Sequence, residues 1–154
     1  MKRVIALVLV VAVAVFVVAV TASSGREKGQ NGRRTITVVE HATTDAVTNG
    51  SKSDRAGNIL TFSNRVFNAA DKKKVGHDQG SCVRIVVGKS WECTWTTFLP
   101  KGQITVEGPF YDKSNSVLAI TGGTGEYKNA RGQMKLKYHN KAGTKFDFVF
   151  QLSH

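Results

Sequence analysis

The side chains best suited to acid–base chemistry are Glu40 and His41, which are neighbours in an apolar run of β-strand character. Adjacent residues of a strand point to opposite faces, so only one of the two can face the interior of a sheet. We favour Glu40, because Val39 and His41 then share the outer face. Burial raises the pKa of a carboxyl group and lets it act as an acid or a base near neutral pH. The alternative is a solvated carboxylate beside an Arg or Lys side chain.

Three further polar residues are candidates for the wall of a cavity. Asn64 stands among apolar residues of a second strand-like run. Asp147 alternates with the phenylalanines of segment 146–150, so it faces a cavity if these rings pack outside the fold and faces solvent if they fill it. Arg131 follows a glycine-rich turn, where its role is either a structural ion pair or ligand binding.

The chain contains two cysteines, Cys82 and Cys93. The segment between them has the pattern of two strand ends joined by a turn at Val87-Gly88, which would place the cysteines opposite each other on paired strands. We predict a disulfide, with two buried free thiols as the alternative. Two thiols without a nearby pair of histidines do not make a tetrahedral site, so no metal site is predicted.

These residues must be positioned by strands, because no window of helical length after the N-terminal segment has an apolar stripe with a period of about 3.6 residues. Short links between the strand-like runs favour antiparallel order, and eight strands can close into a barrel that holds one small ligand. We therefore predict an all-β fold, an eight-stranded antiparallel β-barrel, with a two-sheet sandwich as the alternative. The eight runs are Thr35–Ala42, Asn58–Phe67, Ser81–Val87, Trp91–Leu99, Gln103–Phe110, Val117–Thr121, Gln133–Asn140 and Thr144–Leu152.

The N-terminal segment has the parts of an export signal. Met1-Lys2-Arg3 precedes an apolar run, Val4–Val20, and small residues follow it. We predict that residues 1–22 are a signal peptide cleaved after Ala22, or an uncleaved anchor, because the run approaches the roughly 17–25 residues that span a membrane. Residues 23–34 are predicted to be a disordered basic linker, and residues 35–154 the barrel. Both alternatives place the barrel outside the cytoplasm, either secreted or anchored.

The formal charge of the chain is +11, from 22 Lys and Arg residues against 11 Asp and Glu residues. Such a balance suits anionic partners. However, the basic residues are spread along the sequence, and the run Lys72-Lys73-Lys74 has no aromatic residues interleaved with it. We predict weak association with an anionic envelope surface and no specific binding of nucleic acid.

The segment 117–132 reads VLAITGGTGEYKNARG. Its glycines, Gly122, Gly123, Gly125 and Gly132, are expected at sharp turns where φ is positive. Neither a Lys-Ser/Thr pair nor a helical pattern follows, which argues against a phosphate-binding loop. Tyr127 is expected to cover the end of the barrel.

This segment resembles the signature of dirigent proteins, in which a strand is followed by Gly-Gly-Thr-Gly, an aromatic position and Ala-Arg-Gly. Other segments are similar in order and spacing, and the resemblance extends over roughly Thr35 to Leu152. Dirigent proteins share with allene oxide cyclases an eight-stranded antiparallel barrel with an apolar cavity. The resemblance thus implies the fold that the strand count predicts. The other similar segments are Gly57–Phe62, Cys82–Cys93, Trp95–Phe98 and Gly102–Gly108.

The resemblance also implies which residues act. Glu40 looks like the acidic residue on the first strand of the cyclases. Plant dirigent proteins carry an acidic residue and an arginine before the glycine motif, where this chain has Phe110 and Ser116. This departure argues against coupling of phenoxy radicals. Tyr111 and Asp112 lie next to these positions, where they either substitute for the missing residues or are exposed in a loop, and Tyr111 is a further cavity candidate.

Members of this superfamily use no metal or organic cofactor, so the resemblance implies none here. They hold an apolar small molecule so that one ring or one coupling product forms. We therefore expect a cofactor-independent isomerase or cyclase whose partner is an apolar small molecule. A non-catalytic exported binding or envelope barrel is the alternative. Plant relatives are often trimers, so the resemblance implies a trimer or a dimer.

Overall fold

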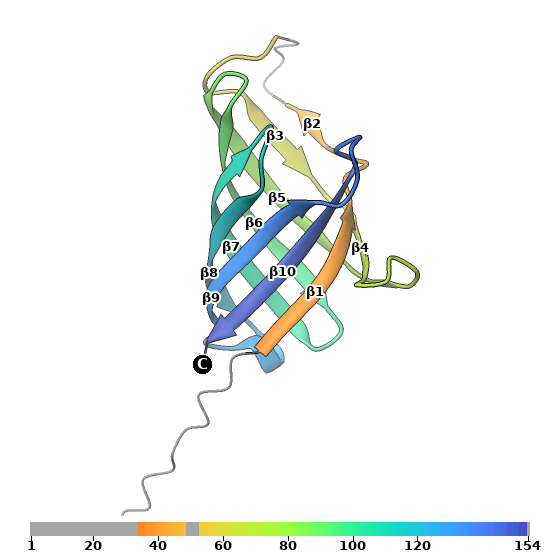
Figure 1. The fold of residues 1–154 in the computed structure, drawn as a ribbon. Helices are drawn as coiled ribbons and strands as arrows, with labels where there is room; N and C mark the ends of the chain where they lie inside the picture. The colour runs from red at the N-terminus through yellow and green to blue at the C-terminus, as the bar shows by residue number, and fades with distance from the viewer. Residues whose placement is uncertain (1–33, 49–52, 154) are drawn as a thin grey trace, which may run out of the picture.

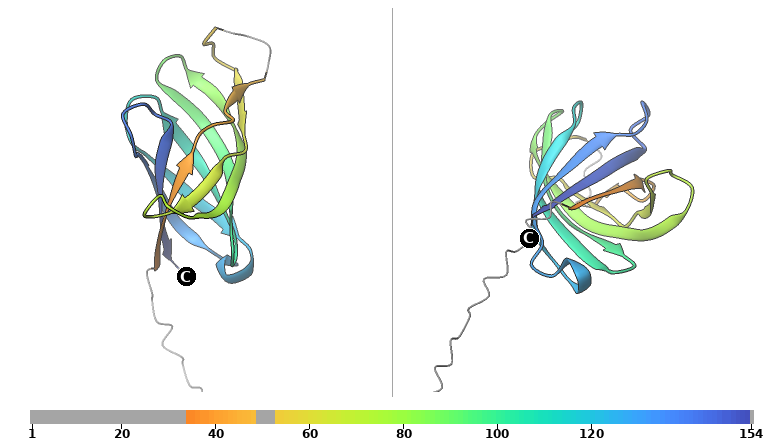
Figure 2. Two further views of the ribbon diagram at one scale, coloured as in Figure 1. Left: turned by 90° about the vertical axis from the view of Figure 1, so that its right-hand side faces the viewer. Right: turned by 60° about the horizontal axis from the view of Figure 1, so that its bottom comes forward.

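The computed structural model describes residues 34–48 and 53–153, which form a ten-stranded sheet and one short 3₁₀ helix. The strands follow the order β2-β3-β5-β4-β1-β10-β9-β8-β7-β6, and pairing of β5 with β6 closes the sheet into a barrel (Figures 1 and 2). Every strand pairing is antiparallel. The elements are β1 (Arg34–His41), β2 (Ala46–Val47), β3 (Ile59–Phe62), β4 (Arg65–Asn68), β5 (Lys74–Val86), β6 (Ser90–Leu99), β7 (Gly102–Tyr111), β8 (Ser116–Gly123), η1 (Gly125–Tyr127), β9 (Arg131–Tyr138) and β10 (Lys145–Ser153).

The barrel has eight strand positions, because β3 and β4 share one position and β2 extends that of β1. Both β3 and β4 pair with β5 on one side. On the other side β4 pairs with β1, and β3 pairs with β2. The predicted eight-stranded antiparallel barrel is therefore confirmed.

Most predicted strands match the observed limits to within two residues, and two differ by more. The run Asn58–Phe67 is interrupted at Ser63 and Asn64, where its neighbour changes from β2 to β1. The strand predicted at Ser81–Val87 begins earlier, at Lys74. Its first half lacks clear alternation because glycines occupy positions where β5 lies close to β6. A Cβ atom on Gly80 would lie 2.3 Å from Cβ of Trp95.

The interior of the barrel is filled from alternate positions of each strand. In β10, Phe146, Phe148 and Phe150 all face the core and are almost fully buried. The barrel is closed at the lower end of Figure 1 by η1, whose Tyr127 side chain is buried. The guanidinium group of Arg34 lies 5.5 Å from the centroid of this ring. Tyr127 thus covers the end of the barrel, as the sequence predicts.

The glycine motif is partly explained by backbone conformation. Gly125 and Gly132 have positive φ, +60° and +125°, as expected. The expectation is wrong for Gly122 and Gly123, which continue β8 and do not have positive φ. A Cβ atom on Gly123 would lie 2.4 Å from the carbonyl oxygen of Tyr127, so close packing against η1 requires glycine there. The space around Gly122 is open, and nothing in the structure explains its glycine.

The predicted signal peptide or anchor, residues 1–22, lies outside the described residues. So does the predicted linker, except for Arg34, which instead begins β1 and pairs with Leu152. Within residues 34–48 and 53–153, no helix is long and apolar enough to cross a bilayer.

Candidate functional site

A cavity of about 450 Å³ occupies the end of the barrel opposite η1. Its rim includes Asp45 from the connection between β1 and β2, Asp112 from the turn after β7, and residues 141–143 from the turn between β9 and β10. These connections lie at the upper end of Figure 1. The wall is mainly aromatic, and its rings belong to Phe62, Trp91, Trp95, Phe110, Tyr138, Phe146 and Phe148.

Glu40 lies on β1, faces the cavity and is 5% exposed. His41, the next residue of β1, faces the other way and stacks on Phe67, with 4.1 Å between ring centroids. Nε2 of His41 also lies 2.6 Å from Oδ1 of Asp71 on this outer side. Of the two adjacent titratable residues, the structure therefore places Glu40 inside the barrel and His41 outside.

Asn64 lies outside the cavity wall and orients the carboxyl group of Glu40 through a hydrogen bond. Its Nδ2 donates hydrogen bonds to Oε1 of Glu40 at 2.8 Å and to Oδ1 of Asp45 at 2.7 Å. Its Oδ1 accepts hydrogen bonds from the backbone N–H groups of Thr43 and Thr44 at 2.9 and 3.0 Å, and from the Thr44 hydroxyl at 3.0 Å. Asn64 is 1% exposed and is not part of the cavity wall. It fills the interruption between β3 and β4 and holds the end of β1 in place.

Asp78, a fully buried residue of β5, was not predicted from the sequence. Its Oδ1 accepts a hydrogen bond from the backbone N–H of Asn64 at 3.2 Å. Its carboxyl group also interacts with that of Glu40, and two carboxyl groups can hydrogen-bond only when one carries a proton. Its Oδ2 has no hydrogen-bond partner among the described residues.

Burial is the main reason why the pKa values of Glu40 and Asp78 are raised. It raises the pKa of Glu40 well above its ordinary value, and the nearby carboxylates of Asp78 and Asp45 raise it further, while the hydrogen bond from Asn64 lowers it. Burial likewise raises the pKa of Asp78, to about 7. The two carboxyl groups interact and therefore titrate as a pair, and burial favours the protonated form of both.

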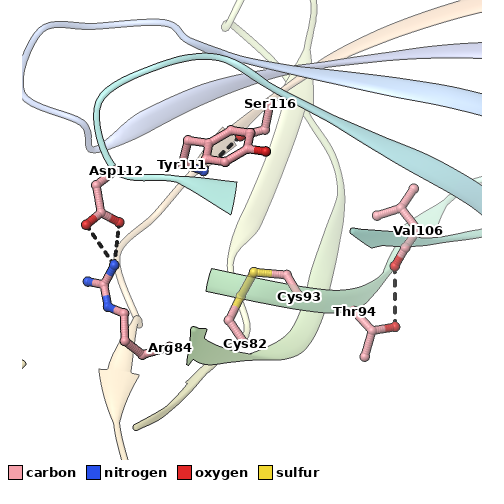
Figure 3. The surroundings of a disulfide bond; sticks show 8 residues. All are labelled: Cys82, Arg84, Cys93, Thr94, Val106, Tyr111, Asp112 and Ser116. Carbon is pink, nitrogen blue, oxygen red and sulfur yellow. Dashed lines mark hydrogen bonds and ion pairs between the residues drawn. A yellow bond between two sulfur atoms is a disulfide. The ribbon is translucent and has the colours of Figure 1, made fainter. Parts of the chain in front are cut away.

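A second polar cluster lies at the rim and was also missed. Arg84 of β5 donates from Nη1 to both carboxylate oxygens of Asp112, at 2.8 and 2.7 Å (Figure 3). Its Nε donates to Oδ1 of Asp54 at 2.7 Å. The guanidinium carbon lies 3.9 Å from the ring centroid of Trp91, which is part of the cavity wall. Arg84 therefore ties together the rim segments that carry Asp54 and Asp112.

The predicted disulfide between Cys82 and Cys93 is confirmed. The two residues are direct partners in the β5–β6 register, with Cα atoms 4.0 Å apart. Figure 3 shows the bond joining the two strands. Both cysteines belong to the cavity wall. The disulfide thus fixes the strand pair that also carries Arg84 and Trp91.

Tyr111 does not contribute to the cavity, contrary to expectation. Strand alternation turns Phe110 inward and Tyr111 outward, where it is 41% exposed. Its backbone N–H donates to Oγ of Ser116 at 2.9 Å (Figure 3). Its neighbour Asp112 reaches the cavity instead. The buried Ser116 hydroxyl therefore serves the β7–β8 turn, and Phe110 lies in the wall.

Asp147 and Arg131 also lie away from the cavity. Since the phenylalanines of β10 fill the barrel, Asp147 faces outward and bonds Nδ1 of His139 through Oδ1 at 2.7 Å. Arg131 is exposed near the closed end, and its Nη1 donates to the carbonyl oxygens of Thr121 and Ala130 at 3.0 and 2.8 Å. Neither residue touches the cavity wall.

The model of one known protein family matches almost the whole chain. The profile of allene oxide cyclase matches residues 17–153. This chain belongs to the allene oxide cyclase family. The family match spans the strands that carry Glu40, Asn64, Asp78 and Arg84. Among the described residues of this family member, no group of three or more His, Cys, Asp or Glu side chains is arranged to hold a metal ion.

Solved structures similar to this allene oxide cyclase family member have the same barrel. A pyocyanin demethylase is 26% identical and matches over 76% of this chain and 100% of its own, with a TM-score of 0.64. A pterocarpan synthase dirigent protein is 16% identical over 80% of this chain and 85% of its own, with a TM-score of 0.68. An exo-specific intermolecular Diels-Alderase is 12% identical over 80% of this chain and 99% of its own, with a TM-score of 0.64. The last two likenesses concern the fold alone.

Proposed function

We propose that this barrel binds an apolar small molecule and guides its cyclisation, isomerisation or stereoselective coupling, with Glu40 as the acid–base residue and without a cofactor. The observation that carries this proposal is the position of Glu40. A buried carboxyl group with a raised pKa lies in the wall of an otherwise largely apolar and aromatic cavity. Burial favours the protonated form of such a group, which can give its proton to a bound molecule and recover it.

The cavity would supply the other part of catalysis, which is control of conformation. Aromatic walls on several sides restrict a flexible substrate to few arrangements, and this lowers the entropic part of the barrier. Asn64 would keep the Glu40 carboxyl in one orientation, because its own amide is fixed by five hydrogen bonds. Asp78 would hold the proton that Glu40 releases or returns, since both carboxyl groups lie in the same buried pair.

The comparisons support small-molecule chemistry without naming the substrate. The family is named for a cyclase, and the similar solved structures are titled as a demethylase, a dirigent protein and a Diels-Alderase. We also propose that the barrel acts outside the cytoplasm, either secreted or anchored. The disulfide supports this location, because such bonds persist in oxidising compartments.

The test replaces Glu40 with Gln in a strain that makes the natural product. Wild-type and E40Q genes are returned to a strain that lacks the native copy, and extracts are compared by chiral chromatography and mass spectrometry. We expect E40Q to reduce the specific product by about 100-fold or more, because acid–base catalysis typically contributes that much. Glu107→Gln is the matched control, since Glu107 is exposed on the outer face of β7.

Unchanged yield and stereochemistry in E40Q would reject the catalytic role. That outcome would favour the second candidate, a non-catalytic exported barrel that binds its ligand or associates weakly with the anionic envelope. The excess of basic residues motivates this alternative. Envelope association driven by charge should weaken as salt concentration rises, because mobile ions screen exposed charges. Binding to isolated envelopes at low and high salt measures it directly.

A further inference from the structure

The charges that line the cavity are opposite in balance to those of the whole chain. The sequence has twice as many basic as acidic residues, 22 against 11. The cavity wall instead carries three acidic side chains, Glu40, Asp45 and Asp112, and a single basic one, Lys141. Lys141 is exposed on the turn between β9 and β10. The cavity wall therefore carries more acidic than basic side chains, with Glu40 inside the barrel and Asp45 and Asp112 at its rim.

The other cation near the cavity is already neutralised. Arg84 is 9% exposed and forms ion pairs with both Asp54 and Asp112. Two carboxylates thus surround one guanidinium group, and the face of that group is covered by the ring of Trp91. The positive charge of Arg84 is already balanced by these two carboxylates, so Arg84 is not available to bind an anionic ligand. A carboxylate or phosphate placed in the cavity would meet acidic side chains, and Lys141, which is exposed, is the one unpaired cation among the described residues that line the cavity.

The walls offer flat apolar surfaces to a ligand. Phe62 and Phe148 flank Trp95 at centroid distances of 6.0 and 5.5 Å, and Phe110 meets Phe146 edge-on at 5.7 Å. The rings are inclined to one another and form several sides of an enclosure. Aromatic faces attract flat aromatic molecules through stacking and attract cations through the ring quadrupole. Together with the acidic residues, these faces match a ligand that is both aromatic and positively charged.

We propose that the ligand of this cavity is a flat aromatic cation, such as a fused ring system with a quaternised or protonated nitrogen. This inference rests on the proposed function only in taking the cavity as the ligand site, and it departs from that proposal in making the ligand positively charged and not apolar. The rings of the ligand pack against Trp91 and Trp95, and its positive charge lies toward Glu40 and Asp45. A volume of about 450 Å³ is within the range of sites for small molecules and admits three fused rings.

Ligand charge is also coupled to protonation of Glu40. The charged or titratable groups facing Glu40 are Asp45 from the β1–β2 connection and Asp78 from β5, while its partners on β4 and β10 are Val66 and Phe146. A cation beside Glu40 favours the ionised carboxylate, so the cation should release a proton as it binds. Its affinity should then rise with pH across the neutral range.

The experiment uses three tricyclic probes of nearly equal shape: N-methylacridinium, acridine at about pH 8, where it is neutral, and anthracene-9-carboxylate. Both tryptophans of the chain line the cavity, so quenching of intrinsic fluorescence reports binding. We expect the cation to bind about tenfold more tightly than the neutral probe, and the anion to bind about tenfold more weakly. Equal or tighter binding of the anion, or no binding of any probe up to about 1 mM, would overturn the proposal.

Variants that remove single acidic side chains show which of them attract the cationic probe. E40Q and Asp45→Asn should each lower affinity for the cation several-fold and leave affinity for neutral acridine unchanged, while E107Q should change neither. Asp45 is exposed at the rim, so D45N remains informative if E40Q disturbs folding. Unaltered cation affinity in both variants counts against the proposal. The binding assay needs no turnover, so a cation preference together with unchanged products from the E40Q strain would reject the proposed catalysis alone.

Discussion

The amide of Asn64 holds the carboxyl group of Glu40, with Nδ2 of Asn64 lying 2.8 Å from Oε1 of Glu40. The same side chain satisfies the backbone at the interruption of the barrel wall, between β1 and β2 on one side and β3 and β4 on the other. The proposed acid–base residue and the most irregular part of the fold are therefore built on one side chain.

Asn64→Ala should destabilise the protein by about 2–4 kcal/mol, because it removes the hydrogen-bond partner of the buried Glu40 carboxyl group and of the N–H groups of Thr43 and Thr44. Urea unfolding monitored by circular dichroism measures the change. Asn115→Ala is the control, since Asn115 is exposed and accepts a single hydrogen bond, from the N–H of Tyr138 at 3.3 Å. Equal losses in the two variants would contradict the role assigned to Asn64.

Stability should fall as pH rises from about 5 to about 8. Glu40 and Asp78 have raised pKa values in the folded protein, so the folded state binds more protons than the unfolded chain in this window. Their stabilising contribution is complete below the ordinary carboxyl pKa near 4 and is lost as pH passes the folded values, about 7 for Asp78. Urea midpoints across this range test the direction.

The same pH series in E40Q and Asp78→Asn assigns the effect to the pair. Each variant removes one titrating carboxyl group, so the decline in stability with pH should become shallower. Glu107→Gln should retain the slope of the wild type. A slope that is unchanged in E40Q and D78N would show that other groups control the pH dependence.

Arg84→Gln should cost about 1–3 kcal/mol, because it leaves Asp112 and Asp54 without their shared cation. It should also change tryptophan emission, since the guanidinium group covers the ring of Trp91. Arg84→Lys should recover only part of the stability, because an ammonium group cannot reproduce the guanidinium's simultaneous hydrogen bonds to both carboxylates. Urea unfolding and emission spectra measure the two effects, and full recovery by lysine would show that charge alone matters.

The adjacent glycines of β8, Gly122 and Gly123, should differ in how much stability is lost when each is replaced by alanine. Gly123→Ala should cost about 2 kcal/mol or more, because the new Cβ atom would lie 2.4 Å from the carbonyl oxygen of Tyr127 and 2.6 Å from that of Gln103. Gly122→Ala should stay within about 0.5 kcal/mol, because no atom lies within 4 Å of its Cβ position. Thermal unfolding of both variants distinguishes these outcomes, and similar losses would contradict the packing described for η1.

The parts of the fold that strand alternation controls could be predicted from the sequence. Phe146, Phe148 and Phe150 share one face, and the short turn around Gly88 brings Cys82 opposite Cys93. The same rule orients Glu40 correctly against His41. These features depend on neighbours along one strand or one hairpin, which a sequence pattern contains.

The remaining parts of the site depend on contacts between distant segments. Asp78 lies in a polar, glycine-containing stretch without visible alternation, and its burial arises only when β5 pairs with β6 and with β3 and β4. Arg84 finds Asp112 across 28 positions of sequence. A charged residue in such a stretch appears solvated until the fold supplies its partners, so neither residue could be recognised beforehand.

The direction of β1 determines how the barrel is presented to its surroundings. The strand starts with Arg34 beside Tyr127 at the closed end and runs toward Glu40 at the cavity. Any support attached ahead of Arg34, such as a lipid bilayer, an affinity resin or a sensor chip, joins the molecule at the end away from the opening. A support coupled directly ahead of Arg34 therefore leaves the cavity end of the barrel free, whereas a tag inserted in the turns that follow β7 or β9 would obstruct it.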